Sequence, residues 1–354
     1  MTRTSLFGVY IHIPFCHHKC DYCAFATWVD KNQLIDEYMD ALVSDINRTD
    51  IQRTDTVFVG GGTPSMVPGP SLVNVIQQLP LADNAEITIE CNPDDVTVEL
   101  MTAYVRGGVN RISMGVQSMV PHVLKTLGRT HQPDNVVRAV SAAREAGISS
   151  INLDIIYGAV GESLDDWRTT LEKAIALAPD HVSAYGLTVE PGTALANRPD
   201  DYPDDDDQAD KYLLANELLE DAGLTNYEIS NWARPGHECQ HNQMYWGQGN
   251  YIGFGCAAHS HQDGRRWWNV RTPERYIDCV SKGVSAETAG ESLDNATRNR
   301  EALELSLRTR EGVPASALPV DELDDLVEQH GDHVVLTVRG RLLANEISLR
   351  LRNR

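Results

Sequence analysis

The sequence predicts an α/β protein in which six β/α units form an open, partial barrel, followed by a smaller C-terminal α+β extension. Strand-like and helix-like segments alternate six times between residues 7 and 222, and this alternation stops after Tyr227. Alternating strands and helices imply a parallel sheet with right-handed crossovers. Six units are too few for a closed eight-fold barrel, and an open twisted sheet is the alternative.

The individual elements follow from hydrophobic periodicity. Short apolar runs predict buried strands, and longer segments with apolar residues every three to four positions predict helices. The predicted strands are residues 7–13, 56–59, 87–90, 111–114, 151–156 and 181–187. The predicted helices are residues 34–46, 72–79, 98–105, 133–146, 164–177 and 209–222.

The later part of the chain divides into two further segments. We expect the barrel to occupy residues 1–225, and a segment rich in Gly, His and Trp, residues 226–296, to pack on it. Residues 297–354 predict two helices and then a β-hairpin with strands at 334–338 and 342–347. Helices followed by a hairpin predict a small winged-helix-like domain.

Composition excludes several classes of function. The 354 residues carry a formal net charge of −21, which argues against general nucleic-acid binding because that requires a basic face. We find no signal peptide and no stretch of 18 apolar residues, so we expect no transmembrane segment and a cytoplasmic location. There, the seven cysteines are expected to be thiols or metal ligands rather than disulfides.

Glycine or polar residues lie at or near the carboxyl ends of five predicted strands. Each of them alone is explained by a turn or a cap, but carboxyl ends of parallel strands meet on one face, which favours a binding site. The glycine run also leaves backbone groups accessible to a ligand. The residues are Gly60, Gly61, Gly62 and Thr63, then Glu90, Gln117, Asp154 and Thr188.

A CxxxCxxC motif follows the first predicted strand and contains Cys16, Cys20 and Cys23. A zinc site needs four ligands, and a [4Fe–4S] cluster usually takes four cysteines, so three thiols leave one position open. Zinc completed by His17, His18 or a distant cysteine is one interpretation. A [4Fe–4S] cluster whose fourth iron binds a small molecule is the other.

The motifs around these cysteines resemble a known family. In chain order they read YIHIPFCHHKCDYCAF, VGGGTPS, ECNPDD, RISMGVQS, LDIIYG, YGLTVEPGT, YEISNWARPG and HNQMYW. They resemble the coproporphyrinogen dehydrogenase-like group of the radical S-adenosylmethionine (SAM) superfamily, over nearly the whole chain. The resemblance implies a radical SAM barrel with a [4Fe–4S] cluster whose open iron binds SAM, and it leaves open whether SAM is cleaved or only bound.

The resemblance also implies roles for individual residues. It places Cys16, Cys20 and Cys23 on the cluster, Tyr10 near SAM, and Gly61, Gly62 and Thr63 at the methionine end. It implies that Asp154 pairs with ribose hydroxyls and Arg129 with a carboxylate, whereas Arg129 is otherwise explained as a surface charge. The remaining residues implied to line the cofactor site are Glu90, Gln117 and Thr188.

Two relatives within this group compete. The oxygen-independent coproporphyrinogen III dehydrogenase, which decarboxylates two propionates oxidatively, usually carries a further cysteine two residues after the motif and a long N-terminal arm. This chain has Phe25 at that position and only fifteen residues before Cys16. Its residues 241–246, HNQMYW, match the HNxxYW motif of the HemW-type haem chaperones. These features favour haem delivery, and a radical SAM enzyme acting on another substrate remains a third interpretation.

Haem binding requires an axial ligand, typically His, Cys, Met or Tyr. His241 is the first candidate because the resemblance places it in the haem motif, and a purely structural hydrogen-bonding role is the alternative. His237 and Cys239 in the same loop, or His259 and His261 further on, also have suitable side chains. The implied partners are haem, haem-accepting proteins and a flavodoxin- or ferredoxin-like reductant, and a peripheral membrane contact stays open.

Overall fold

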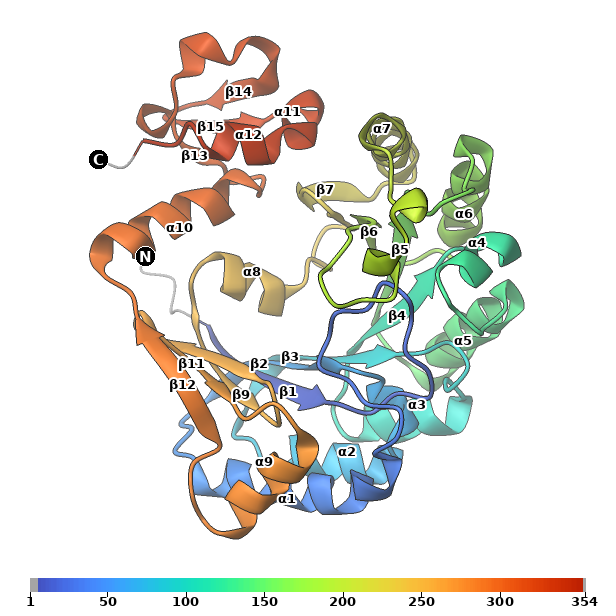
Figure 1. Cartoon of the computed structure of the whole chain (residues 1–354), viewed down its shortest axis with the longest axis vertical. Helices are drawn as coiled ribbons and strands as arrows, with labels where there is room; N and C mark the ends of the chain where they lie inside the picture. The colour runs from blue at the N-terminus through green and yellow to red at the C-terminus, as the bar shows by residue number, and fades with distance from the viewer. Residues whose placement is uncertain (1–5, 353–354) are drawn as a thin grey trace.

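The computed structural model describes residues 6–352 and contains the six predicted β/α units. The strands are β1 (Phe7–Ile13), β2 (Thr54–Gly61), β3 (Leu81–Cys91), β4 (Arg111–Gln117), β5 (Ser150–Tyr157) and β6 (His181–Gly186). The helices are α1 (Ile35–Arg48), α2 (Gly69–Ile76), α3 (Val98–Arg106), α4 (Pro121–Thr126), α5 (Pro133–Ala146), α6 (Leu164–Ala176) and α7 (Asp205–Asp221). The six strands pair in chain order and all run parallel, with the helices on the outer side of the curved sheet (Figure 1). The predicted partial barrel is therefore confirmed.

Residues 226–296 enlarge the same sheet at both of its edges. Their elements are β7 (Thr225–Glu228), β8 (Asn231–Ala233), α8 (Gln240–Trp246), β9 (Asn250–Phe254), β10 (His259–Gln262), β11 (Arg265–Asn269), α9 (Pro273–Ser281) and β12 (Glu287–Ser292). The sheet has twelve strands in the order β12-β11-β10-β9-β1-β2-β3-β4-β5-β6-β8-β7. Strand β9 pairs parallel with β1, and α8 packs against β1 and β2. The predicted domain boundaries stay a prediction.

The two faces of β1 show why the sheet curves around a polar interior. Val9, Ile11 and Ile13 are fully buried and point to the outer side, where they join the main hydrophobic core with α1. The alternate residues Tyr10 and His12 point to the inner side, because successive side chains of a strand face opposite ways. The outer face therefore supplies most of the apolar burial, and the inner face is available for polar groups.

The C-terminal part has its own hydrophobic core, centred on residues such as Leu307, Val334 and Ile347. Its elements are α10 (Asn295–Leu307), β13 (Val313–Pro314), β14 (Val327–His330), β15 (His333–Leu336), α11 (Val338–Leu342) and α12 (Ala344–Ser348). The strands form a three-stranded antiparallel sheet in the order β13-β15-β14. The predicted α+β extension is thus present, and no helix of residues 6–352 is long and apolar enough to cross a membrane.

Two details of the predicted extension are wrong. Residues 342–347 lie at the end of α11, in the turn at Leu343 and in α12 rather than in a strand, and β15 pairs instead with β14 through a turn at Gly331, where φ is +65°. Thr337 begins a helix at this point because its side chain accepts a hydrogen bond from Gly340 N, which is the typical N-cap arrangement. The second predicted helix is also wrong, since only β13 and short 3₁₀ turns lie between α10 and β14.

Candidate active site

A cavity of about 570 Å³ lies at the carboxyl ends of the parallel strands. It brings together the residues predicted for the cluster and for SAM, except Tyr10 and the first glycine of the run, Gly60, and none of the candidate haem ligands lines it. Those that line it are Cys16, Cys20, Cys23, Gly61, Gly62, Thr63, Glu90, Gln117, Arg129, Asp154 and Thr188. The convergence expected from the strand ends is therefore present in the fold.

The cysteine loop, residues 14–31, connects β1 to α1 and is fixed at its base. Cys16 N donates to Trp28 O at 3.0 Å, and Trp28 N donates to Pro14 O at 2.8 Å, so Phe15 and Trp28 form a parallel bridge that closes the loop at its base. His12 Nε2 donates to Ala26 O at 2.9 Å from the inner face of β1. These bonds hold the loop that carries the three thiols over the end of the barrel.

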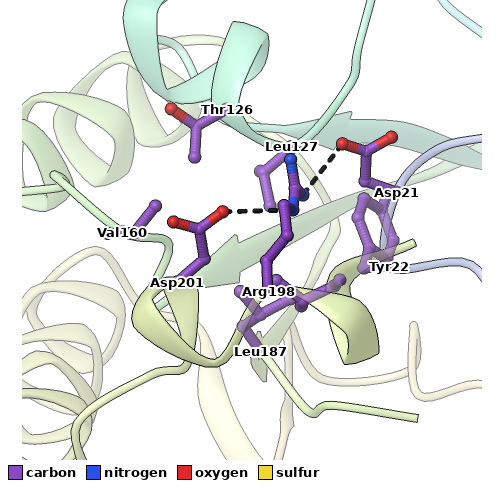
Figure 2. Close-up of a pocket in the computed structure, with 9 residues that line it drawn as sticks. Asp21, Tyr22, Thr126, Leu127, Val160, Leu187, Arg198 and Asp201 are labelled. Carbon is purple, nitrogen blue, oxygen red and sulfur yellow. Dashed lines mark hydrogen bonds and ion pairs between the residues drawn. The ribbon is translucent and has the colours of Figure 1, made fainter. Parts of the chain in front are cut away.

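A second segment, between β6 and α7, binds the cysteine loop through an ion pair and a hydrogen bond. Arg198 Nη2 lies 2.9 Å from Asp21 Oδ2 and its Nε lies 3.1 Å from Asp201 Oδ2, and Figure 2 shows this guanidinium between the two carboxylates. Leu195 N also donates to Asp21 O at 2.9 Å. Since Asp21 follows Cys20 directly, these contacts restrain the loop between two of the thiols.

The three thiols fit a cluster better than a single ion. Thr63 Oγ1 donates to Cys16 Sγ at 3.5 Å and Arg129 Nη1 donates to Cys20 Sγ at 3.6 Å, so donors already face sulfurs that would carry negative charge. Among residues 6–352, no three His, Cys, Asp or Glu side chains converge closely enough for one metal ion. An iron–sulfur cluster needs no such convergence, because each cysteine binds a different iron.

The glycine run places bare backbone beside the cysteine loop. Gly62 N donates to Ile13 O and Thr63 N donates to Phe15 O, both at 2.7 Å. A Cβ on Gly62 would press on Phe15 O, and Gly61 has φ of +110°, which only glycine adopts without strain. The run therefore requires glycine both for its backbone shape and for its close approach to the loop.

Two of the carboxyl groups in the cavity wall, those of Glu90 and Asp154, have raised pKa values. Burial, and then the charge of Asp154, raises the pKa of Glu90 to about 7, although Gly61 N donates to Glu90 Oε2 at 3.0 Å. Burial also raises the pKa of Asp154, against hydrogen bonds such as that from Ser113 Oγ at 2.7 Å. Buried carboxylates of this kind favour a ligand that brings positive charge and hydroxyl donors. SAM, with its ammonium, sulfonium and ribose hydroxyls, has that chemistry.

The other predicted residues differ in how directly they face the cavity. Gln117 has φ of +61°, a conformation that is unusual outside glycine and clusters at functional sites. Arg129 is no free surface charge, because its Nη2 donates to Gly115 O at 2.8 Å. Tyr10 does not line the cavity, and its hydroxyl is bonded to His12 Nδ1 at 3.0 Å. Its contact with SAM stays a prediction.

Sequence reasoning missed several residues of the cavity wall. They include Tyr22, Asn92, Ser113 and Tyr185. Ser113 could have been found from the alternation of side chains along a strand. It lies two residues before Gly115 in β4, so both face the inner side of the sheet. Phe25, which stands where the coproporphyrinogen dehydrogenases usually carry a further cysteine, is exposed and also lines the cavity.

His241 lies elsewhere, on α8 at the opposite end of the barrel interior. Its side chain is fully buried, with Nδ1 bonded to Thr56 Oγ1 at 2.9 Å and the ring packed 4.5 Å from that of Tyr245. Its Nε2 has no hydrogen-bond partner within residues 6–352. Burial, and then the nearby Arg111 charge, lowers its pKa to about 3. The imidazole is therefore neutral at pH 7 and has one unpaired nitrogen.

This burial makes the protein sensitive to acid. Unfolding lets His241 bind a proton near pH 6.5, whereas the folded state resists protonation down to about pH 3, so stability is lost as pH falls through that window. In the wild type, the free energy of unfolding therefore falls between pH 6 and pH 4. We expect His241→Asn to reduce the slope of this fall by up to about 1.4 kcal/mol per pH unit. Urea unfolding at several pH values measures this. His330→Asn, at an exposed position, is expected to keep the wild-type slope, and an unchanged slope in the His241 variant would contradict the assignment.

Comparison with known proteins identifies the family of this chain. Residues 10–174 match the model of the radical SAM superfamily. The heme chaperone HemW of Mycobacterium tuberculosis is 40% identical, over 96% of this chain and 93% of its own length. HemW of Escherichia coli is 42% identical over 78% of this chain and 77% of its own, and HemW of Bacillus subtilis is 33% identical over 96% and 97%.

A solved structure supports the fold as well. The coproporphyrinogen III oxidase HemN of Escherichia coli, a radical SAM enzyme, superposes with a TM-score of 0.85 over 98% of this chain and 89% of its own. At 24% identity this likeness concerns the fold alone. The matches to the heme chaperones are closer in sequence and cover between 78% and 96% of this chain. This chain belongs to the HemW heme chaperone family of the radical SAM superfamily.

Proposed function

We propose that this protein binds haem and passes it to haem-requiring proteins, with a [4Fe–4S] cluster and SAM as its cofactors. The observation that carries the proposal is Phe25, a phenylalanine 65% exposed in the cavity wall, where the coproporphyrinogen dehydrogenases usually carry a further cysteine. Relatives named heme chaperones match the chain over most of its length. A cytoplasmic location and an electron donor of the flavodoxin or ferredoxin type are part of the same proposal.

The residues of the cavity have defined tasks in this proposal. Cys16, Cys20 and Cys23 would hold the cluster, and binding would displace protons from Cys16 and Cys23, whose pKa values burial raises. The backbone of Gly61 and Gly62 would receive the methionine end of SAM, and the carboxylate of Asp154 would accept from the ribose hydroxyls. When bound, the cluster and SAM together supply one-electron chemistry, and the protein supplies binding, orientation and shielding from water.

We propose His241 as the axial ligand of haem. Ligating histidines usually engage their second ring nitrogen with a neighbouring group, which sets the tautomer and the ring orientation, and Thr56 occupies Nδ1 here. The neutral imidazole fits this role, as does Nε2, which has no hydrogen-bond partner among the residues that the structure describes. Because the side chain is fully buried, haem reaches it only when α8, a helix of seven residues, moves away from β2.

The experiment that separates chaperone from oxidase uses the anaerobically reconstituted protein. Haem is added stepwise and the Soret band is recorded, while a parallel sample receives coproporphyrinogen III, SAM and a reductant. We expect saturable haem binding at one haem per chain and no conversion of the porphyrinogen. Conversion without saturable haem binding would establish the oxidase instead, and a defined product from another substrate would favour a third kind of radical SAM enzyme.

SAM binding is expected to depend on the absence of a side chain at Gly62. In Gly62→Ala, the new Cβ presses on Phe15 O and lies 2.8 Å from Ile13 O, so the glycine run must shift away from the cysteine loop. We expect SAM affinity to fall at least about tenfold, or 1.4 kcal/mol, in equilibrium dialysis without reductant. Gly69→Ala is the control, because the only short contact of its Cβ is with a flexible methyl group of Leu100, at 2.9 Å, and it is expected to bind SAM normally. Wild-type affinity in Gly62→Ala would refute the placement.

A further inference from the structure

A continuous chain of buried hydrogen bonds crosses the barrel interior, from the cavity to the start of α8. Asn152 Nδ2 donates to Asp154 Oδ1 at 2.8 Å, and Asn152 Oδ1 lies 2.6 Å from His181 Nδ1. His181 Nε2 lies 2.7 Å from the Tyr227 hydroxyl, which accepts from Cys239 N at 3.1 Å. Cys239 is the N-cap residue of α8, and Asn152, His181, Tyr227 and Cys239 are all buried.

The direction of every bond follows from the carboxylate at one end. Ionised Asp154 only accepts, so Asn152 must present its amide nitrogen to it and its oxygen to His181. His181 Nδ1 therefore carries the proton, and Nε2 accepts from the Tyr227 hydroxyl. The pKa of His181 is well below its usual range because of burial, which agrees with an imidazole that keeps a single proton. Each group thus donates toward Asp154, and bonds aligned in one direction polarise and strengthen one another.

The far end of the chain helps to hold α8 closed. Cys239 N is fixed by Tyr227, and the next two amides, Gln240 N and His241 N, both donate to the Glu86 carboxylate at 3.0 Å. Thr56 holds the ring of His241. In this position α8 encloses Nε2 of His241, so whatever strengthens the attachment of α8 opposes access to that nitrogen.

We propose that this chain couples the SAM site to α8, so that bound SAM holds α8 over His241 and weakens haem binding. The inference rests on the proposed function, because it uses Asp154 as a partner of the SAM ribose and His241 as the haem ligand. Hydroxyl donors on Asp154 favour its ionised form, which accepts a stronger hydrogen bond from Asn152 than the protonated carboxyl does. SAM therefore stabilises the closed attachment of α8, which haem must displace.

Coupling between two ligands is reciprocal, so it is measured from both sides. Haem is titrated into the reconstituted, unreduced protein with and without saturating SAM, and SAM is titrated with and without haem. We expect SAM to raise the Kd for haem at least about fivefold, and haem to raise the Kd for SAM by the same factor. If SAM changes the Kd for haem by less than about twofold, or makes haem bind more tightly, the inference is overturned.

Tyr227→Phe breaks the chain in its middle without touching either proposed ligand site. We expect it to reduce the coupling factor to about one, while the protein still binds both ligands. Tyr212→Phe is the matched control, since Tyr212 is equally buried but donates to Ile229 O at 3.0 Å, outside the chain, and it should keep the wild-type factor. If SAM still raises the Kd for haem in Tyr227→Phe, the coupling does not pass through this chain of hydrogen bonds. Failure of the wild type to bind haem would instead refute the proposed function itself.

Discussion

Cys20→Ser is expected to remove nearly all iron and the brown charge-transfer absorbance from the anaerobically reconstituted protein. A cluster held by only three cysteines has none to spare, and a serine hydroxyl is a poor ligand for its iron. Arg129 Nη1, which donates to Cys20 Sγ at 3.6 Å, would also lose its sulfur partner. Iron and sulfide analysis together with the visible spectrum measures the loss, and SAM affinity should fall with the cluster content.

Cys279→Ser is the control for that experiment. Cys279 is a partly buried free thiol on α9, outside the cavity wall, and its replacement is expected to leave the iron content unchanged. A Cys20 variant with wild-type absorbance would contradict the assignment of the cluster ligands. Loss of the absorbance in both variants would show that reconstitution depends on the total number of thiols rather than on this loop.

His241→Ala is expected to weaken haem binding at least about tenfold and to change the Soret maximum of any haem that remains bound. The reason is the loss of a neutral imidazole whose Nε2 has no other partner within the described part of the chain. His241→Gln keeps much of the volume and a polar group next to Thr56, so it separates loss of the ligand from loss of packing. Cluster content and circular dichroism report whether each variant folds.

His237→Ala tests the neighbouring alternative under the same conditions. His237 lies shortly before α8 and its Nδ1 is 3.1 Å from Ser150 Oγ, so its imidazole already has a polar partner. We expect this variant to bind haem like the wild type. If haem binding is lost in His237→Ala and kept in His241→Ala, the axial ligand is His237, and α8 need not open.

Periodicity was enough to predict the six parallel strands and the place of the site. Runs such as residues 7–13 and 151–156 are buried on the outer face, so their apolar residues reveal them, and the polar residues that follow them meet at one end of the barrel. The strands at the sheet edges gave no such signal. β12, for example, is fully exposed, and only its pairing with β11 identifies it as a strand.

Other features depend on tertiary contacts that no local pattern records. The burial of His241 follows from the packing of α8 inside the barrel, and the chain through His181 and Tyr227 joins residues 46 positions apart. Residues 342–347 contain Leu342, Leu343 and Ile347, and an apolar segment this short does not distinguish a strand from a helix, which explains the wrong hairpin. The resemblance to the radical SAM superfamily implied the chemistry of the cavity, whereas its connection to α8 required the structure.

Transfer of haem tests the central claim most directly. The haem-loaded protein is mixed with an excess of an apo-b-type cytochrome, and the Soret band is followed as it shifts to that of the acceptor. The account predicts that the cytochrome takes up haem faster from this protein than from haem-loaded albumin. It also predicts that Cys279→Ser transfers haem like the wild type. Haem that stays on the chain, or reaches the cytochrome no faster than from albumin, would contradict a role in haem delivery.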